Sequence, residues 1–74
     1  MEKIIYVKLL DEGTEVYRPV PATEVGEGVF KIMGVDIYNP DDEIWEFPPG
    51  ICVQVVEKNL SCENVLVAIN EFLI

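Results

Sequence analysis

The chain has 74 residues and carries 14 acidic against five basic residues, a net charge of −9 at pH 7. Half of its residues are hydrophobic, which excludes a disordered chain. A chain this short forms one small domain, which we expect to span residues 1–74. Its longest aliphatic run, residues 65–69, is far shorter than the roughly 20 residues of a membrane-spanning helix. The first residues lack the features of a secretory signal, so we expect a cytoplasmic protein.

The negative charge is concentrated in the second half of the chain. Residues 36–74 carry eight acids and one base, whereas residues 1–35 carry six acids and four bases. Direct binding of nucleic acid or of an anionic membrane needs a basic surface, so we expect neither partner. The charge is compatible with a protein partner that has a basic surface, and equally with an acidic surface that only keeps the protein soluble.

The residue types needed for most catalytic and metal sites are scarce. The chain has no histidine and only two cysteines, Cys52 and Cys62, which leaves no zinc site and no Cys–His pair. In the hairpin expected below, these cysteines lie roughly 20 Å apart at about 3.3 Å per residue, too far for a disulfide. No glycine-rich phosphate loop is present either. The sequence therefore predicts two free thiols, no cofactor, no metal and no enzymatic activity.

The first third of the chain has strand-like alternation interrupted by turn residues. Residues 3–10 alternate apolar and polar side chains, which predicts a strand, and residues 11–13 suit a tight turn with Gly13 in the left-handed conformation. The following segment contains Pro19 and Pro21, which lack a backbone N–H. We therefore place it on a sheet edge or in a long irregular loop.

The middle of the chain predicts two further short strands. Residues 29–33 form the first, which ends at Gly34. Residues 39–43 have the pattern of a helix start, but Pro48 would end such a helix after about two turns. The alternation over residues 44–47 favours a strand preceded by a turn at 39–42. Trp45 and Phe47 then share one face, which predicts that both belong to the core.

The last third predicts an antiparallel hairpin of residues 51–58 and 64–71 after a type II turn at Pro49-Gly50. A register that pairs Val55 with Val67 and Val53 with Ile69 would put both apolar sets on one side. Together these segments make about five short antiparallel strands. The predicted fold is all-β, a small and strongly bent barrel.

Two segments carry a resemblance to a known group of proteins. Residues 10–20, LDEGTEVYRPV, and residues 42–50, DEIWEFPPG, resemble a group of small uncharacterised bacterial proteins. The resemblance spans about residues 5–68. It implies an SH3-like barrel in which residues 14–28 form a long loop after the first strand, and no particular activity. Tyr17 stands where the group has tryptophan.

The same resemblance does not extend to eukaryotic peptide-binding SH3 domains. The chain lacks their alanine-leucine-tyrosine-aspartate-tyrosine signature and their paired tryptophans. The capture of proline-rich ligands is therefore not implied.

The candidate binding residues lie in two segments, 11–18 and 36–47. We expect a non-enzymatic protein-interaction module that binds its partner through loop aromatics and nearby acids, namely Tyr17, Tyr38, Asp41, Asp42 and Glu43. The alternative is that the tyrosines complete the core and the acids form a solvated turn. The acids are not expected to bind calcium, because their spacing does not match a calcium-binding loop. Arg18, the single arginine, is expected to pair structurally near Tyr6 or the acids of the first loop.

Two other functions are compatible with the sequence. The acidic half could imitate a nucleic-acid backbone, as in an immunity or anti-defence inhibitor that blocks a basic toxin or nuclease. Alternatively, an uncovered strand edge could make the protein a homodimer.

Overall fold

The computed structural model describes residues 2–60 and 62–73, and this part of the chain is all-β, as predicted. Its strands are β1 (Glu2–Leu10), β2 (Tyr17–Gly26), β3 (Val29–Ile32), β4 (Ile44–Trp45), β5 (Cys52–Leu60) and β6 (Glu63–Glu71). No helix within the described ranges has the length and hydrophobicity needed to cross a membrane.

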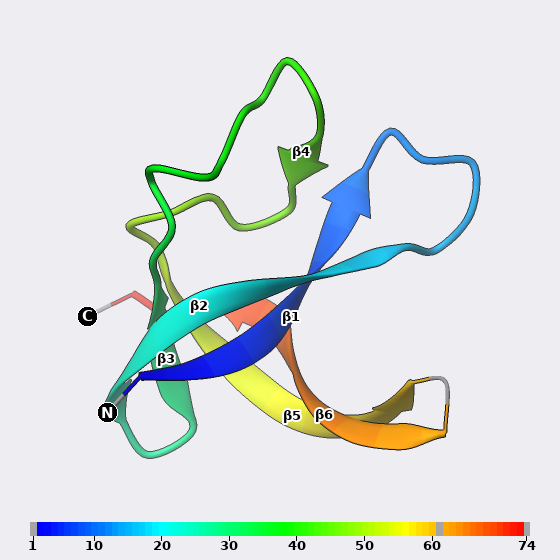
Figure 1. Ribbon diagram of the computed structural model, residues 1–74. Coiled ribbons are helices and arrows are strands. Elements are labelled where there is room, and N and C mark those ends of the chain that lie inside the picture. The colour runs from blue at the N-terminus through cyan, green and yellow to red at the C-terminus, as the bar shows by residue number, and fades with distance from the viewer. Residues whose placement is uncertain (1, 61, 74) are drawn as a thin grey trace.

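The strands form one sheet that closes into a ring (Figure 1). The order is β2-β3-β5-β6-β1-β4, and β1 also pairs with β2, so that five strands close on themselves while β4 is added at the end of β1. Most neighbours are antiparallel, but β1 and β6 run parallel, with Tyr6 opposite Val67. The expectation of about five short antiparallel strands is therefore wrong in detail. The described residues form six strands, four of them nine or ten residues long.

The largest departure from the expected fold is β2, because residues 14–28 are not a long irregular loop. β2 pairs with β1 from Thr23 to Tyr17. The Pro21 carbonyl accepts a hydrogen bond from the Met33 amide, so it points away from β1. The nitrogen and carbonyl of one strand residue point to the same side, so the Pro21 nitrogen also faces away from β1. The ladder with β1 therefore does not need the N–H that proline lacks. Pro19 has the same parity and lies beyond the residues that pair with β3. β2 lies between β1 and β3, so the expected edge position of the two prolines is wrong, and both belong to a regular strand.

Three turns fix the connections between the strands. In the β1–β2 loop the left-handed residue is Asp11, with φ 63°, and not Gly13 as expected. Gly34 ends β3 with φ 96°, and Gly50 has φ 97° in a turn closed by the Ile51 amide on the Pro48 carbonyl. The predicted type II turn requires such a positive φ at its third residue.

The hairpin of β5 and β6 is confirmed, but its predicted register is wrong. Val55 faces Ala68, one residue from its expected partner, and Val53 faces Glu71, two residues from its expected partner. Only two residues separate Leu60 from Glu63, and Cys62 there has φ 69°. This short connection, together with a bulge between Gln54 and Val55, sets the register instead of the apolar pattern. Cys52 is half-buried, Cys62 is exposed, and both are free thiols.

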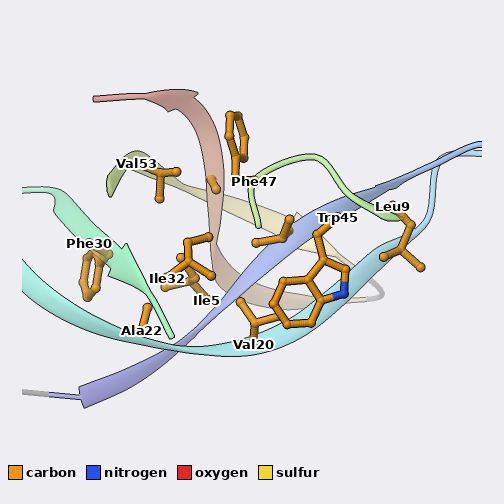
Figure 2. Close-up of a cluster of buried hydrophobic side chains, with 11 residues drawn as sticks. Ile5, Leu9, Val20, Ala22, Phe30, Ile32, Trp45, Phe47 and Val53 are labelled. Atoms are coloured by element: carbon orange, nitrogen blue, oxygen red, sulfur yellow. The ribbon is translucent and has the colours of Figure 1, made fainter. Parts of the chain in front are cut away.

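The core fills the inside of the ring (Figure 2). Trp45 and Phe47 are buried there, as predicted, with 2% and 9% of their surfaces exposed. The largest fully buried side chains are Trp45, Ile5, Ile32, Val7, Val20, Val53 and Val67. Alternate residues of a strand point to opposite faces, and Val20 and Ala22 point into the ring. The residues of β2 next to them, Pro19 and Pro21, therefore point outward.

Candidate functional site

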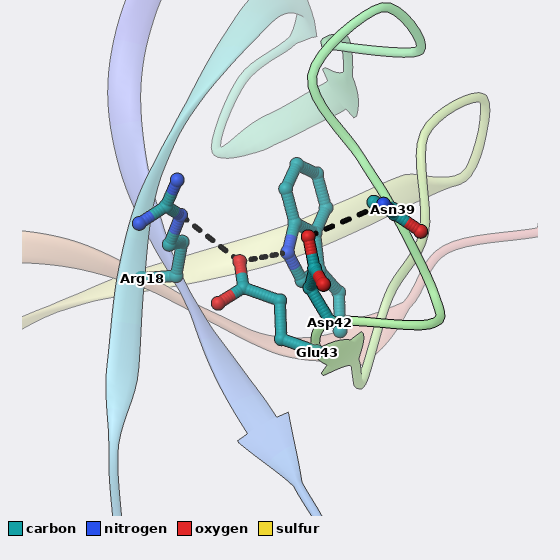
Figure 3. A network of polar contacts seen from close by, with 5 residues as sticks. Arg18, Asn39, Asp42 and Glu43 are labelled. Carbon is teal, nitrogen blue, oxygen red and sulfur yellow. Dashed lines mark hydrogen bonds and ion pairs between the residues drawn. The ribbon is translucent and has the colours of Figure 1, made fainter.

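Arg18 and Glu43 join the two segments that the sequence analysis selected (Figure 3). The Arg18 Nε lies 3.0 Å from the Glu43 Oε1, and the Trp45 Nε1 donates to the same oxygen at 2.9 Å. Arg18 therefore does not pair with Tyr6 or with the first-loop acids, because its parity in β2 turns it toward Trp45. The two side chains are 47% and 24% exposed, and an ion pair this exposed contributes at most about 1 kcal/mol. Glu43 thus holds the loop before β4 against β2.

The turn that precedes β4 is organised by Asn39. Its Oδ1 accepts a hydrogen bond from the Asp41 amide at 3.0 Å, and its Nδ2 donates to the Asp42 Oδ2 at 3.2 Å. The Asp42 and Glu43 amides donate to the Asn39 carbonyl. This is the local bonding typical of asparagine in turns. The segment at 39–42 is therefore a turn, as predicted, and β4 follows it.

The acids of this turn do not converge on a metal site. Asp41 and Asp42 are exposed. Among the described residues, no three carboxylate or thiol side chains come together in a way that could hold a metal ion.

Tyr38 lies on the core side of the same loop. Its ring packs on that of Trp45 with 4.6 Å between centroids and 50° between planes, and it is half-buried. Tilted aromatic contacts of this kind stabilise a core beyond their buried area. Tyr38 is therefore not a freely exposed aromatic, contrary to the expectation for a binding residue.

Tyr17 lies on the other face of β2, away from Tyr38. The side chains of Val20 and Ala22 point into the ring, so Arg18 shares their side and Tyr17 points outward. The structure thus brings Tyr38 and Glu43 into contact with Trp45 but does not bring Tyr17 to them. The candidate surface divides into two separate sites.

Tyr17 lines an open pocket of about 470 Å³, within the range of about 300–1,000 Å³ typical of ligand sites. One wall comes from the outer face of the first two strands and their connecting loop, and the other from the end of the β5–β6 hairpin. The lining residues are Tyr6, Glu15, Val16, Tyr17, Leu60, Glu63 and Val65. We call this the tyrosine pocket.

An apolar stripe leads away from the tyrosine pocket along the outer face of β1 and β2. Ile4 lies opposite Pro21, and Tyr6 lies opposite Pro19. All four alternate with buried residues, so they point outward, and Ile4 is 58% exposed. A pocket that continues into an apolar strip has the shape needed for an extended peptide.

Sequence reasoning selected Tyr17 in this pocket but missed Tyr6, Leu60, Glu63 and Val65. A signal for Tyr6 was present, since it alternates with Ile5 and Val7 and so faces outward. No local pattern connects it with the hairpin end, because that contact depends on the closing of the ring.

Glu15 and Tyr17 are joined by a hydrogen bond from the Tyr17 hydroxyl to the Glu15 Oε1. This bond lowers the pKa of Glu15 against an opposing effect of desolvation, and the charges of Lys8 and Lys58 lower it further. The same bond, followed by desolvation and the charge of Glu15, raises the pKa of Tyr17. Across neutral pH the pocket therefore presents an ionised carboxylate beside a neutral phenol.

We expect this pair to break at both ends of the pH range. The contribution of Glu15 to stability is present above its unfolded pKa and is lost as the pH falls through its lowered folded value. The contribution of Tyr17 is present below about pH 10 and is lost as the pH rises through its raised folded value. Ultraviolet titration of the tyrosines should show that Glu15→Gln lowers the pKa of Tyr17. Glu12→Gln, in the same loop, is the control, and an equal effect of both would contradict the pairing.

Comparison of the chain with models of protein families, with curated proteins and with solved structures gave no match in any of the three.

Proposed function

We propose that this protein is a non-enzymatic interaction module on a small SH3-like barrel, and that the tyrosine pocket holds part of a protein partner. The observation that carries the proposal is an open pocket of about 470 Å³ lined by two tyrosines and two glutamates. Tyrosine is enriched in binding surfaces because its ring offers a large contact area at a low cost in conformational entropy. The adjoining apolar stripe extends the surface beyond the pocket.

The SH3-like class of the barrel rests on the ring of strands and on the sequence resemblance. A ring in which five strands close on themselves agrees with a small barrel. The ten-residue β2 in place of a long loop sets this chain apart from the expected pattern.

The rival proposal, an acidic inhibitor that imitates nucleic acid, predicts different binding residues. Charge imitation would depend on exposed acids such as Asp41 and Asp42, whereas the interaction module depends on Tyr17. Two variants therefore separate the functions: Tyr17→Ala, and the double variant Asp41→Asn with Asp42→Asn. Tyr17, Asp41 and Asp42 are not part of the hydrophobic core, so neither change should unfold the protein.

We expect the tagged protein to co-purify a specific partner, Tyr17→Ala to abolish this capture, and the double asparagine variant to retain it. Glu27→Gln, at an exposed residue between β2 and β3, controls for the loss of a charge elsewhere. Capture that survives Tyr17→Ala but is lost in the double variant would refute the interaction module and favour the inhibitor. Circular dichroism of each variant checks that the fold is intact.

A further inference from the structure

The chemistry of the tyrosine pocket identifies the group that it would hold. Its seven lining residues include the rings of Tyr6 and Tyr17, the carboxylates of Glu15 and Glu63, and no basic residue. Aromatic faces attract cations through the ring quadrupole, and carboxylates accept hydrogen bonds from ammonium or guanidinium groups. A neutral or anionic group would gain neither interaction.

We infer that the tyrosine pocket binds the cationic side chain of a lysine or arginine in an extended segment of the partner. This inference rests on the proposed function and specifies its ligand. The aliphatic part of such a side chain can pack on Leu60 and Val65 while its charged end meets the carboxylates. Neighbouring residues of the segment would lie on the apolar stripe of Ile4, Pro19 and Pro21.

The walls of the pocket suit a side chain that enters from outside. Tyr6 and Tyr17 come from neighbouring strands, where Tyr6 faces Pro19 and Tyr17 faces Lys8. Glu63 begins β6 on the opposite wall. Glu15 lies in the β1–β2 loop and Glu63 at the start of β6, so a guest cation would meet an acidic residue on each wall of the pocket.

Two lysines oppose this attraction. Lys8 and Lys58 are close enough to Glu15 to affect its pKa, although neither lines the pocket. A guest cation must therefore compete with them for the carboxylates. The removal of one of these positive charges should therefore strengthen the binding of a cationic ligand, whereas the removal of a carboxylate should weaken it.

The probe is a blocked pentapeptide with one arginine between glycines, compared with the same peptide carrying citrulline, which is similar in shape but uncharged. Backbone amide shifts of the ¹⁵N-labelled protein follow the titration. We expect saturable shifts at Tyr6, Tyr17, Glu63 and Val65 with the arginine peptide and none of comparable size with the citrulline peptide. Equal shifts with both peptides would overturn the inference.

Three variants and one control sharpen the titration. Each cation–π contact is worth about two- to fivefold in affinity at an exposed site, so Tyr17→Ala should weaken binding by at least that factor. Glu63→Gln should weaken it by about two- to fivefold, and Lys58→Gln should strengthen it by about twofold. Glu27→Gln should change nothing. Weakening by Glu27→Gln equal to that by Glu63→Gln would show a diffuse response to net charge and would refute a specific site.

The two proposals can fail separately. If the arginine peptide does not bind but Tyr17→Ala still abolishes capture of the partner, the cationic ligand is wrong and the interaction module stands. If capture is also indifferent to Tyr17→Ala, both proposals fall.

Discussion

Replacement of Trp45 by alanine should unfold a large fraction of the protein. Removal of a buried tryptophan costs about 3–5 kcal/mol, whereas a chain of this length has a total stability of about 4–11 kcal/mol. Trp45 is 2% exposed, carries the tilted contact with Tyr38 and donates to Glu43, so three interactions are lost together. Urea unfolding followed by far-ultraviolet circular dichroism measures the effect. Tryptophan fluorescence cannot be used, because Trp45 is the only tryptophan and the variant lacks it.

Trp45→Phe is the matched control for this change. It keeps an aromatic ring in the core and removes the indole N–H, while the ion pair of Arg18 with Glu43 remains possible. We expect it to cost clearly less than the alanine variant. A loss below about 1 kcal/mol in Trp45→Ala would contradict the central place of this side chain in the core.

Alanine at Gly34 or Gly50 should produce the second largest loss. Both glycines have nearly the same left-handed backbone, with φ of 96° and 97°, which an L-residue adopts at a cost of about 1–3 kcal/mol. Their surroundings differ. A Cβ at Gly50 meets nothing within 4 Å, whereas one at Gly34 lies 3.1 Å from the Ile37 Cγ1 and 3.4 Å from the Pro21 Cγ.

The difference between these two variants therefore isolates the packing of the loop after β3. We expect Gly50→Ala to show the backbone cost alone and Gly34→Ala to show that cost and a further loss, because the new Cβ crowds Ile37. Thermal unfolding of both variants beside the wild type provides the comparison. A loss at Gly34 equal to that at Gly50 would mean that Ile37 moves aside without cost, which would contradict the expected packing loss.

Local alternation predicted much of the fold because it reports directly which face of a strand is buried. It placed β1 with Ile5 and Val7 inward, the position of β3, and Trp45 and Phe47 in the core. The hairpin of β5 and β6 also followed from its apolar residues. Its register did not, because the two-residue connection before Glu63 and the bulge after Gln54 are features of backbone geometry.

Two other features depended on contacts that no local pattern encodes. The regular strand β2 was missed because proline normally interrupts a ladder, and only its pairing partners show that the nitrogens of Pro19 and Pro21 face away from β1. Only one wall of the tyrosine pocket was predicted from the sequence. Tyr17 was selected from the sequence, but the opposite wall, with Glu63 and Val65, comes from residues more than 40 positions away in the chain.

The two walls of the tyrosine pocket differ in what they contribute to folding. Val16 in the first wall packs against the hydrophobic cluster, whereas Leu60, Glu63 and Val65 at the end of the hairpin do not. Mutation at these three positions can therefore change what the pocket accepts without a large loss of stability. Selection could adapt the ligand preference of this protein at its hairpin end while the rest of the barrel stays the same, much as loop variation on a constant scaffold diversifies other binding proteins.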